Sequence, residues 1–160
     1  MERIAPTSSL GRLLGWCQKQ AATDLHAQAD RRYSFRVDGK LRRIPPDQFA
    51  PPANEDIQKM LGEAFSQSVY DRIEKRYETD LSFLCGPLRY RANFSKQQGA
   101  QSFSFRVVPQ RIPELDDLQL PHTVADLVKE PRGLLLVTGA AGQGKSTTAF
   151  ATASGFARMG

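Results

Sequence analysis

Long apolar runs are absent from this sequence, and no segment approaches the ~20 apolar residues that a membrane-crossing helix needs. The first residues also lack the apolar core of a secretory signal, because Glu2 and Arg3 lead directly to Pro6. We therefore expect no transmembrane segment. The sequence predicts a cytoplasmic protein, or one that is at most peripheral to a membrane.

Cysteine and histidine are scarce as well. The chain has two of each, Cys17, Cys85, His26 and His122, with no CxxC pair and no spacing typical of metal ligands. This excludes a disulfide-stapled fold and a zinc site. We interpret both cysteines as free, buried thiols of a reducing compartment.

The charge balance is basic but dispersed. The 160 residues carry a net charge of +5 and have a pI near 9.5, with 40% hydrophobic residues as in a globular protein. Such a balance is compatible with nucleic acid, an anionic membrane surface, phosphate ligands or a solvated basic face. The basic residues are scattered rather than gathered in one run, which favours the solvated face over nucleic acid: Arg31, Arg32, Arg42, Arg43, Arg89 and Arg91.

The first half of the chain alternates helix and hairpin signals. A helix is predicted after the capping residues 7–9, because Leu10, Leu13, Leu14 and Cys17 follow helical spacing. Asp38-Gly39 between two short alternating runs predicts a tight hairpin. A proline-rich connector, IPPDQFAPPAN, is more typical of a rigid loop than of a recognition motif.

A second, longer helix is expected to begin at Asn54 as its cap. Its apolar stripe should form core: Ile57, Met60, Leu61, Ala64, Phe65, Val69, Ile73 and Tyr77.

After Asp80 the pattern becomes that of strands. LSFLC, LRYRANF and QSFSFRVV predict an antiparallel meander. Residues 109–121, with three prolines, read as a linker between domains, and a short helix is expected over 123–129. The fold class is thus α/β (α+β), with an antiparallel N-terminal domain over 1–108.

The strongest chemical motif lies near the C-terminal end. Gly139, Gly144, Lys145 and Ser146 satisfy the phosphate-loop spacing GxxxxGK[ST], with a further glycine at Gly142. Glycines let backbone N–H groups surround phosphate oxygens, the lysine places a positive charge on the β- and γ-phosphates, and the serine hydroxyl binds Mg²⁺. ATP and Mg²⁺ are therefore the expected cofactors.

The flanks of this motif support the interpretation. Residues 134–138 form a short apolar run of strand length, and residues 146–158 contain no proline and fit a helix. The alternative is a glycine-rich turn that binds no ligand. It is less favoured because the glycine loop, the Lys-Ser pair and the flanking segments all match the strand, loop and helix order of a phosphate-binding loop.

The second carboxylate of phosphate-loop hydrolases is missing, since no Asp or Glu follows Glu130 in these 160 residues. Partner strands for the apolar run at 134–138 are missing too. We expect these residues alone to show no substantial ATP hydrolysis, and the segment over 122–160 to be poorly organised by itself.

Several segments together resemble one known family. ATDLHAQ, FRVDGKLRRI, RYRANF, FRVVPQRIPELDDLQLP and PRGLLLVTGAAGQGKSTT are similar, in this order, to the segments of PilT-like twitching-motility ATPases. These belong to the wider type II/type IV secretion and type IV pilus ATPase superfamily. One departure is Ala140-Ala141-Gly142-Gln143, where the family usually has Pro-Thr-Gly-Ser.

The resemblance implies a PAS-like N-terminal domain over 1–108, a linker over 109–121 and the incomplete start of a RecA-like ATPase domain over 122–160. It also implies a homo-hexamer with ATP at subunit interfaces, and an inner-membrane platform protein of a pilus or secretion system as partner. No nucleic acid is implied.

The resemblance assigns roles to individual residues. Arg91 and Arg106 match two N-domain arginines that reach the nucleotide phosphates when the domains close; the alternative is that both are ordinary strand-face arginines. Gly139, Gly142 and Gly144 would shape the cradle, and Lys145 and Ser146 would hold phosphate and Mg²⁺. Thr147 would contact the α-phosphate and Gln143 would line the loop. Asp24 and His26 match a family segment, but we interpret them as structural.

The expected function is therefore the ATP-binding portion of a motor for pilus retraction, twitching motility or related secretion. One alternative is a non-catalytic interaction module that docks on ATPase subunits and carries a vestigial phosphate loop. A weaker alternative is a nucleic-acid-linked motor of the conjugation type.

Overall fold

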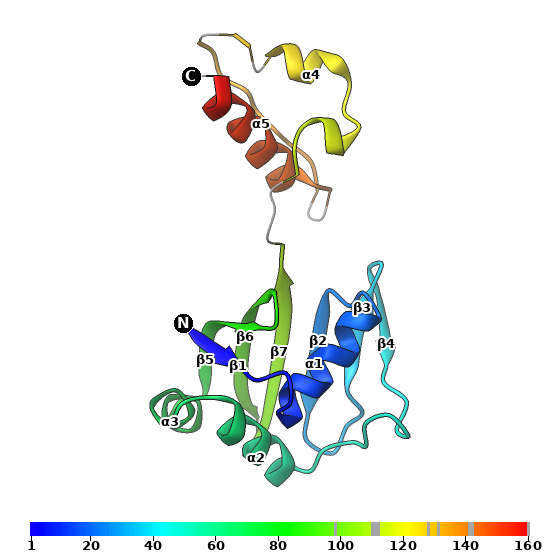
Figure 1. Cartoon of the computed structure of the whole chain (residues 1–160), viewed down its shortest axis with the longest axis vertical. Helices are drawn as coiled ribbons and strands as arrows, with labels where there is room; N and C mark the ends of the chain where they lie inside the picture. The colour runs from blue at the N-terminus through cyan, green and yellow to red at the C-terminus, as the bar shows by residue number, and fades with distance from the viewer. Residues whose placement is uncertain (98, 110–112, 128, 131, 141–142, 160) are drawn as a thin grey trace. The chain divides into compact units, whose positions relative to one another are not determined.

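The computed structural model describes residues 1–97, 99–109, 113–127, 129–130, 132–140 and 143–159. The chain divides into two units, Met1–Pro109 and Gln110–Gly160. The first unit is a mixed α/β fold, and the second contains helices, among them α4 (His122–Leu127) and α5 (Lys145–Met159) (Figure 1).

A mostly antiparallel sheet forms the first unit, with seven strands among the described residues in the order β1-β5-β6-β7-β2-β3-β4. Only the pairing of β1 with β5 is parallel, and every other neighbouring pair is antiparallel. The strands are β1 (Glu2–Ile4), β2 (Asp24–Gln28), β3 (Ser34–Val37), β4 (Lys40–Arg43), β5 (Glu78–Cys85), β6 (Leu88–Gln97) and β7 (Ala100–Val108).

The predicted hairpin and meander are confirmed. Asp38 and Gly39 join β3 to β4 with φ angles of 48° and 74°, which the primed turns of two-residue hairpins require. Strands β5, β6 and β7 pair in sequence order, as the alternating segments indicate. The short parallel strand β1 is not predicted by the sequence, because three residues carry no periodic signal.

The first helix, α1 (Ser9–Lys19), follows its predicted pattern. The hydroxyl of Ser8 caps it by accepting a hydrogen bond from the Gly11 amide at 3.0 Å. The four apolar positions that the pattern predicted are buried and belong to the core: Leu10, Leu13, Leu14 and Cys17.

The single long helix expected from residue 54 onward is wrong. The chain forms two helices, α2 (Asn54–Ala64) and α3 (Gln67–Lys75), because Phe65 adopts an extended backbone between them. That turn directs the Phe65 ring into the core, edge-on to Phe83 at 5.5 Å. Glu2 holds the break by accepting hydrogen bonds from the amide and hydroxyl of Ser66.

Two details of that prediction change with the break. Tyr77 falls beyond α3 and is 86% exposed, so it does not belong to the core. Asn54 is the first helical residue rather than the cap, and its side-chain oxygen instead accepts the Gln101 amide of β7. The predicted core residues Ile57, Leu61 and Ile73 are buried as expected.

Aromatic side chains fill the space between helices and sheet. Phe83 is fully buried and contacts Phe65, Tyr90 and Phe105 at ring distances of 5.1–5.5 Å. Cys17 and Cys85 are both buried and free, and burial raises the pKa of the Cys17 thiol to about 12. Both thiols are therefore protonated and unreactive at neutral pH.

The second unit contains a 3₁₀ turn, Asp116–Leu118, and two helices, α4 (His122–Leu127) and α5 (Lys145–Met159). Residues 134–138, predicted as a strand, form no strand. Leu134 and Leu136 are 84% and 73% exposed, because no second strand of this unit lies beside them in the described chain.

The two glycines of α1 provide a test of the packing. A Cβ on Gly11 would collide with the carbonyl oxygen of Ala5, whereas a Cβ on Gly15 would meet nothing within 4 Å. Gly11→Ala should lower the free energy of unfolding by about 1–3 kcal/mol, because the obstructing atom belongs to the backbone.

Gly15→Ala is the matched control, and it should be neutral or stabilising by up to about 1 kcal/mol through helix propensity. Urea unfolding followed by the fluorescence of Trp16, the only tryptophan, measures both. Equal effects of the two substitutions would contradict the described packing.

Candidate functional site

The face of the sheet opposite α1 and α2 is polar. Directly paired residues share a face, and one row across the sheet reads Arg36, Asp24, Arg106, Arg91 and Ser82. The next row reads Ser34, His26, Ser104, Asn93 and Asp80. Polar side chains therefore stand beside one another on this face, across strands distant in sequence.

Arg91 and Arg106 are direct cross-strand partners on β6 and β7. Both are solvent-exposed, and together with Asp24, His26 and Asn93 they line a shallow hollow of about 360 Å³. The fold thus brings together the two arginines that the sequence singles out. Two adjacent guanidinium groups suit a ligand with several phosphate oxygens, because each can bind oxyanions bidentately.

Asp24 fixes the position of Arg106. Its carboxylate is 7% exposed and accepts a hydrogen bond from the Arg106 Nε at 2.8 Å and one from the Thr23 hydroxyl at 2.8 Å. Arg36 lies at 3.7 Å on its other side. Burial acts to raise the pKa of Asp24, but the hydrogen bonds from Arg106 and Thr23 and the Arg106 charge outweigh it, so this pKa is lowered.

His26 lies one row away on β2. Burial lowers the pKa of its imidazole, Asp24 acts in the opposite direction, and the charges of Arg36 and Arg106 lower it further. The ring is therefore neutral at pH 7. Among the described residues no three His, Cys, Asp or Glu side chains are grouped as metal ligands would be.

The phosphate-loop motif occupies the turn before α5. Gly139 and Gly144 have φ angles of 151° and 80°, in the region that favours glycine. The Lys145 ammonium bends back over this turn and donates a hydrogen bond to the Ala140 carbonyl at 2.7 Å. Gly142 lies outside the described residues. The backbone N–H of the exposed Gln143 donates a hydrogen bond to the Ala140 carbonyl at 3.4 Å.

The first turn of α5 suits an anion. The first helical hydrogen bond described runs from the Thr148 amide to the Gly144 carbonyl at 2.9 Å. The amides of Lys145, Ser146 and Thr147 precede it and have no carbonyl partner within the helix. With the positive end of the helix dipole and the exposed hydroxyls of Ser146 and Thr147, these groups fit a phosphate and its Mg²⁺.

Sequence reasoning missed one feature of the polar face. It described the basic residues as scattered, whereas Arg31, Arg32 and Arg43 line a single hollow. The alternation of polar and apolar residues along β2 and β3 indicates which side chains share a face. It does not show which strands pair, and the pairing is what brings these arginines together. Sequence reasoning interpreted Asp24 as structural, and the contact of Asp24 with Arg106 agrees with that interpretation.

Comparison with known proteins gives consistent results. No family model matches the chain. It is 34% identical over 137 residues to the type IV pilus retraction ATPase PilT of Pseudomonas aeruginosa, a match that covers 85% of this chain and 39% of the relative. It is 29% identical over 149 residues to the type II secretion system protein E of Aeromonas hydrophila, covering 85% and 29% respectively.

A solved structure is similar over nearly the whole chain. The crystal structure of the pilus retraction motor PilT with bound ADP superposes with a TM-score of 0.73 and 32% identity, covering 92% of this chain and 42% of that one. The chain thus spans about two fifths of the length of these PilT structures and sequences. No helix in the described ranges is long and apolar enough to span a bilayer.

The ion pair of Asp24 predicts a particular pH dependence. Asp24→Asn should lower the free energy of unfolding by about 1 kcal/mol at neutral pH, a modest value because the Arg106 side chain is 73% exposed. A carboxyl whose pKa is lower in the folded than in the unfolded state stabilises the fold at pH values above the unfolded pKa. This stabilisation is lost as the pH falls through the folded pKa.

The two proteins should therefore differ fully above about pH 5. They should converge as the pH falls below 3.8, the ordinary Asp pKa. Denaturant titrations at a series of pH values measure this. Asp80→Asn, an exposed carboxyl on the same face, is the control and should change little. A difference for Asp24→Asn that persists undiminished in acid would refute the ion pair as its cause.

Proposed function

Because the chain belongs to the family of PilT-like type IV pilus and type II secretion ATPases, we propose that it is the nucleotide-binding part of such a motor. In this proposal residues 1–108 are a PAS-like N-terminal domain and residues 109–121 are a linker. Residues 122–160 are the start of a RecA-like ATPase domain.

The observation that carries the proposal is the geometry of the turn before α5. Two glycines with positive φ, a lysine directed back over the turn and a helix that begins at that lysine occur together. Positive-φ glycines and a helix N-terminus suit phosphate binding by backbone amides, and the lysine adds a positive charge beside them. A simple turn between core elements does not need this combination.

In the proposed site Gly139, Gly142 and Gly144 shape the cradle, and Lys145 binds the β- and γ-phosphates. Ser146 holds Mg²⁺, Thr147 contacts the α-phosphate, and Gln143 lines the loop. Bound Mg-ATP would supply the charged phosphate chain that the motor cleaves. Binding requires Lys145 to exchange its hydrogen bond to Ala140 for phosphate oxygens, which are stronger acceptors.

Arg91 and Arg106 are proposed to reach the nucleotide from the first unit when the domains close. Their cross-strand pairing and exposure support this role, since both guanidinium groups are available on the same face. Asp24 would hold Arg106 in position without neutralising Arg91. The pair therefore retains a net positive charge for phosphate.

The assembled motor is proposed to be a cytoplasmic homo-hexamer at the inner membrane, coupled to the platform protein of a pilus or secretion system. Hydrolysis there requires a carboxylate that holds Mg²⁺ and helps to activate water. No Asp or Glu follows Glu130 in these 160 residues, so we expect them to bind nucleotide without substantial turnover.

A second candidate function is a non-catalytic module that docks on ATPase subunits. The exposed apolar side chains of the second unit favour it, because Leu134, Leu136 and Phe150 are 60–84% exposed. An apolar surface of this kind is suited to pairing with strands of another ATPase subunit.

Titration of this chain with Mg-ATP tests the first proposal. Lys145→Ala should weaken binding by at least tenfold, because it removes the ammonium that the phosphates require. The double substitution Arg91→Ala/Arg106→Ala should weaken nucleotide binding less than Lys145→Ala does. It should have this effect only if the two units close on one nucleotide. Calorimetry or fluorescence of a labelled nucleotide measures both, with Arg76→Ala as an exposed control arginine of the first unit.

Binding that is unaffected by Lys145→Ala would exclude the phosphate loop as the nucleotide site. Absence of any binding, together with inhibition of a full-length relative's ATPase upon mixing, would instead favour the docking module. Phosphate release that disappears in Lys145→Ala would overturn the expectation that these residues do not hydrolyse ATP.

A further inference from the structure

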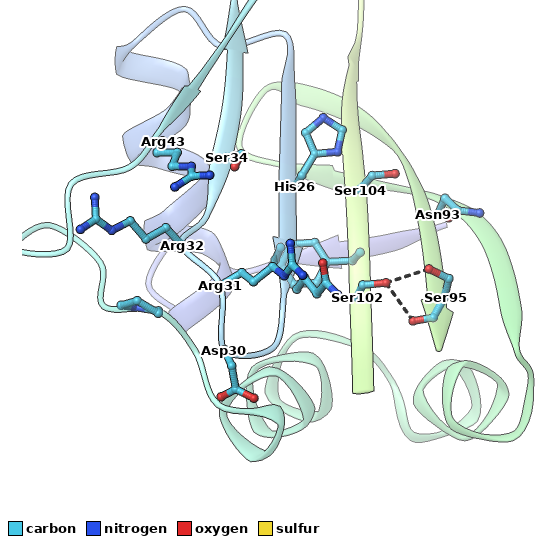
Figure 2. A pocket seen from close by; sticks show the side chains of 14 residues that line it. His26, Asp30, Arg31, Arg32, Ser34, Arg43, Asn93, Ser95, Ser102 and Ser104 are labelled. Atoms are coloured by element: carbon cyan, nitrogen blue, oxygen red, sulfur yellow. Dashed lines mark hydrogen bonds between the residues drawn. The ribbon is translucent and has the colours of Figure 1, made fainter. Parts of the chain in front are cut away.

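A second hollow lies on the polar face of the sheet, with a volume of about 850 Å³ (Figure 2). It is built entirely within the first unit, from strands β2, β3, β4, β6 and β7, the β2–β3 connection, and Pro51 of the β4–α2 connection. This volume falls within the ~300–1,000 Å³ typical of small-molecule sites.

Arginines from two different segments line this hollow. Arg31 and Arg32 come from the turn after β2, and Arg43 comes from the last position of β4. In Figure 2, Arg32 and Arg43 lie on one side, and Arg31 reaches toward the middle of the sheet. In the described part of the chain none of these three guanidinium groups has a salt bridge or a side-chain hydrogen bond.

The charge of the hollow is accordingly positive. Its one carboxylate, Asp30, leaves a net charge of about +2 when it is set against the three arginines. The neighbouring charge cluster differs, because there Asp24 already pairs with Arg106 and Arg36. The hollow thus has cationic groups that remain available for a ligand.

Neutral hydrogen-bonding groups form the remainder of the lining. Ser102 is already engaged with Ser95, whose hydroxyl lies 2.8 Å away (Figure 2). Ser34 and Ser104 have no hydrogen-bond partner for their hydroxyls within the described ranges, and His26 lies beside Ser104. Arginine forks with adjacent free hydroxyls are the groups that bind phosphate oxygens in proteins.

We propose that this hollow binds a soluble small molecule that carries two or more phosphate groups. Three guanidinium groups on two segments exceed what a single monoanion needs, and a diphosphate can contact both segments at once. The concave shape favours a soluble small molecule, which can enter a hollow of this volume, over the flat surface of a bilayer. The bounded volume favours a small molecule over an extended acidic polypeptide.

This site goes beyond the nucleotide-binding function, because it lies in the first unit and shares no residue with the loop before α5. It also does not include Arg91 or Arg106. Ligand binding here and at the phosphate loop can therefore be separated by substitution.

The test is titration of the whole chain with pyrophosphate, in a Lys145→Ala background that removes the phosphate loop's contribution. Arg31→Gln and Arg43→Gln should each weaken binding about tenfold, since each removes a charge-assisted interaction. Arg76→Gln makes the same charge change on an exposed residue outside the hollow and should leave affinity within about twofold. Amide chemical shifts should move at Ser34, Ser102 and Ser104.

Several outcomes would overturn the proposal. One is that Arg76→Gln weakens pyrophosphate binding as much as Arg31→Gln and Arg43→Gln do, and another is that sulfate binds as tightly as pyrophosphate. Either result would indicate only the general attraction of a basic surface for anions. A third is binding that depends on Arg91 but not on Arg31 and Arg43. A fourth is arginine-dependent binding to phosphatidylglycerol vesicles or to a pentaglutamate peptide without binding of pyrophosphate. Unchanged thermal unfolding of the variants would show that lost binding does not reflect lost folding.

Discussion

The strict alternation of side chains along β2, β6 and β7 is the constraint on which the first unit depends. Leu25, Ala92 and Phe105 lie on one face, and Asp24, Arg91 and Arg106 on the other. A one-residue slip of β7 would bury Arg106 and the serines of its face, and it would expose Phe103 and Phe105. The burial of Phe83, Phe94, Phe103 and Phe105 therefore fixes the register, and the register fixes the polar face.

The same register gives the polar face its two different basic areas. Around Arg91 and Arg106 a buried carboxylate, Asp24, holds one arginine and limits its movement. Around Arg31, Arg32 and Arg43 no such carboxylate pairs with the guanidinium groups in the described residues. An arginine that is already held by a carboxylate loses little conformational entropy when a ligand binds. Unpaired arginines provide more positive charge, but they lose more conformational entropy because the ligand itself must order them.

Local patterns in the sequence predicted most of these elements. The Asp38-Gly39 turn, the capped helix α1 and the β5–β7 meander each depend on signals within a few residues. The failures have non-local causes. The break at Phe65 depends on an aromatic pocket formed by β5 and β6, and on Glu2, which lies 64 residues before Ser66. The convergence of Arg31 with Arg43, and of Asp24 with Arg106, likewise depends on strand pairing.

The second unit shows the same distinction between local and non-local determinants. The positive φ angles of Gly139 and Gly144 and the start of α5 depend on residues close to one another in the sequence. They are present even though residues 134–138 pair with no strand in the described chain. A strand is stabilised by its neighbours, so its apolar side chains stay exposed until such neighbours are present. In the proposed function, phosphate binding and hydrolysis therefore depend on separable parts of an ATPase domain. Phosphate binding would depend on local geometry of the kind present before α5, whereas the carboxylate that holds Mg²⁺ and helps to activate water would have to be positioned by a sheet.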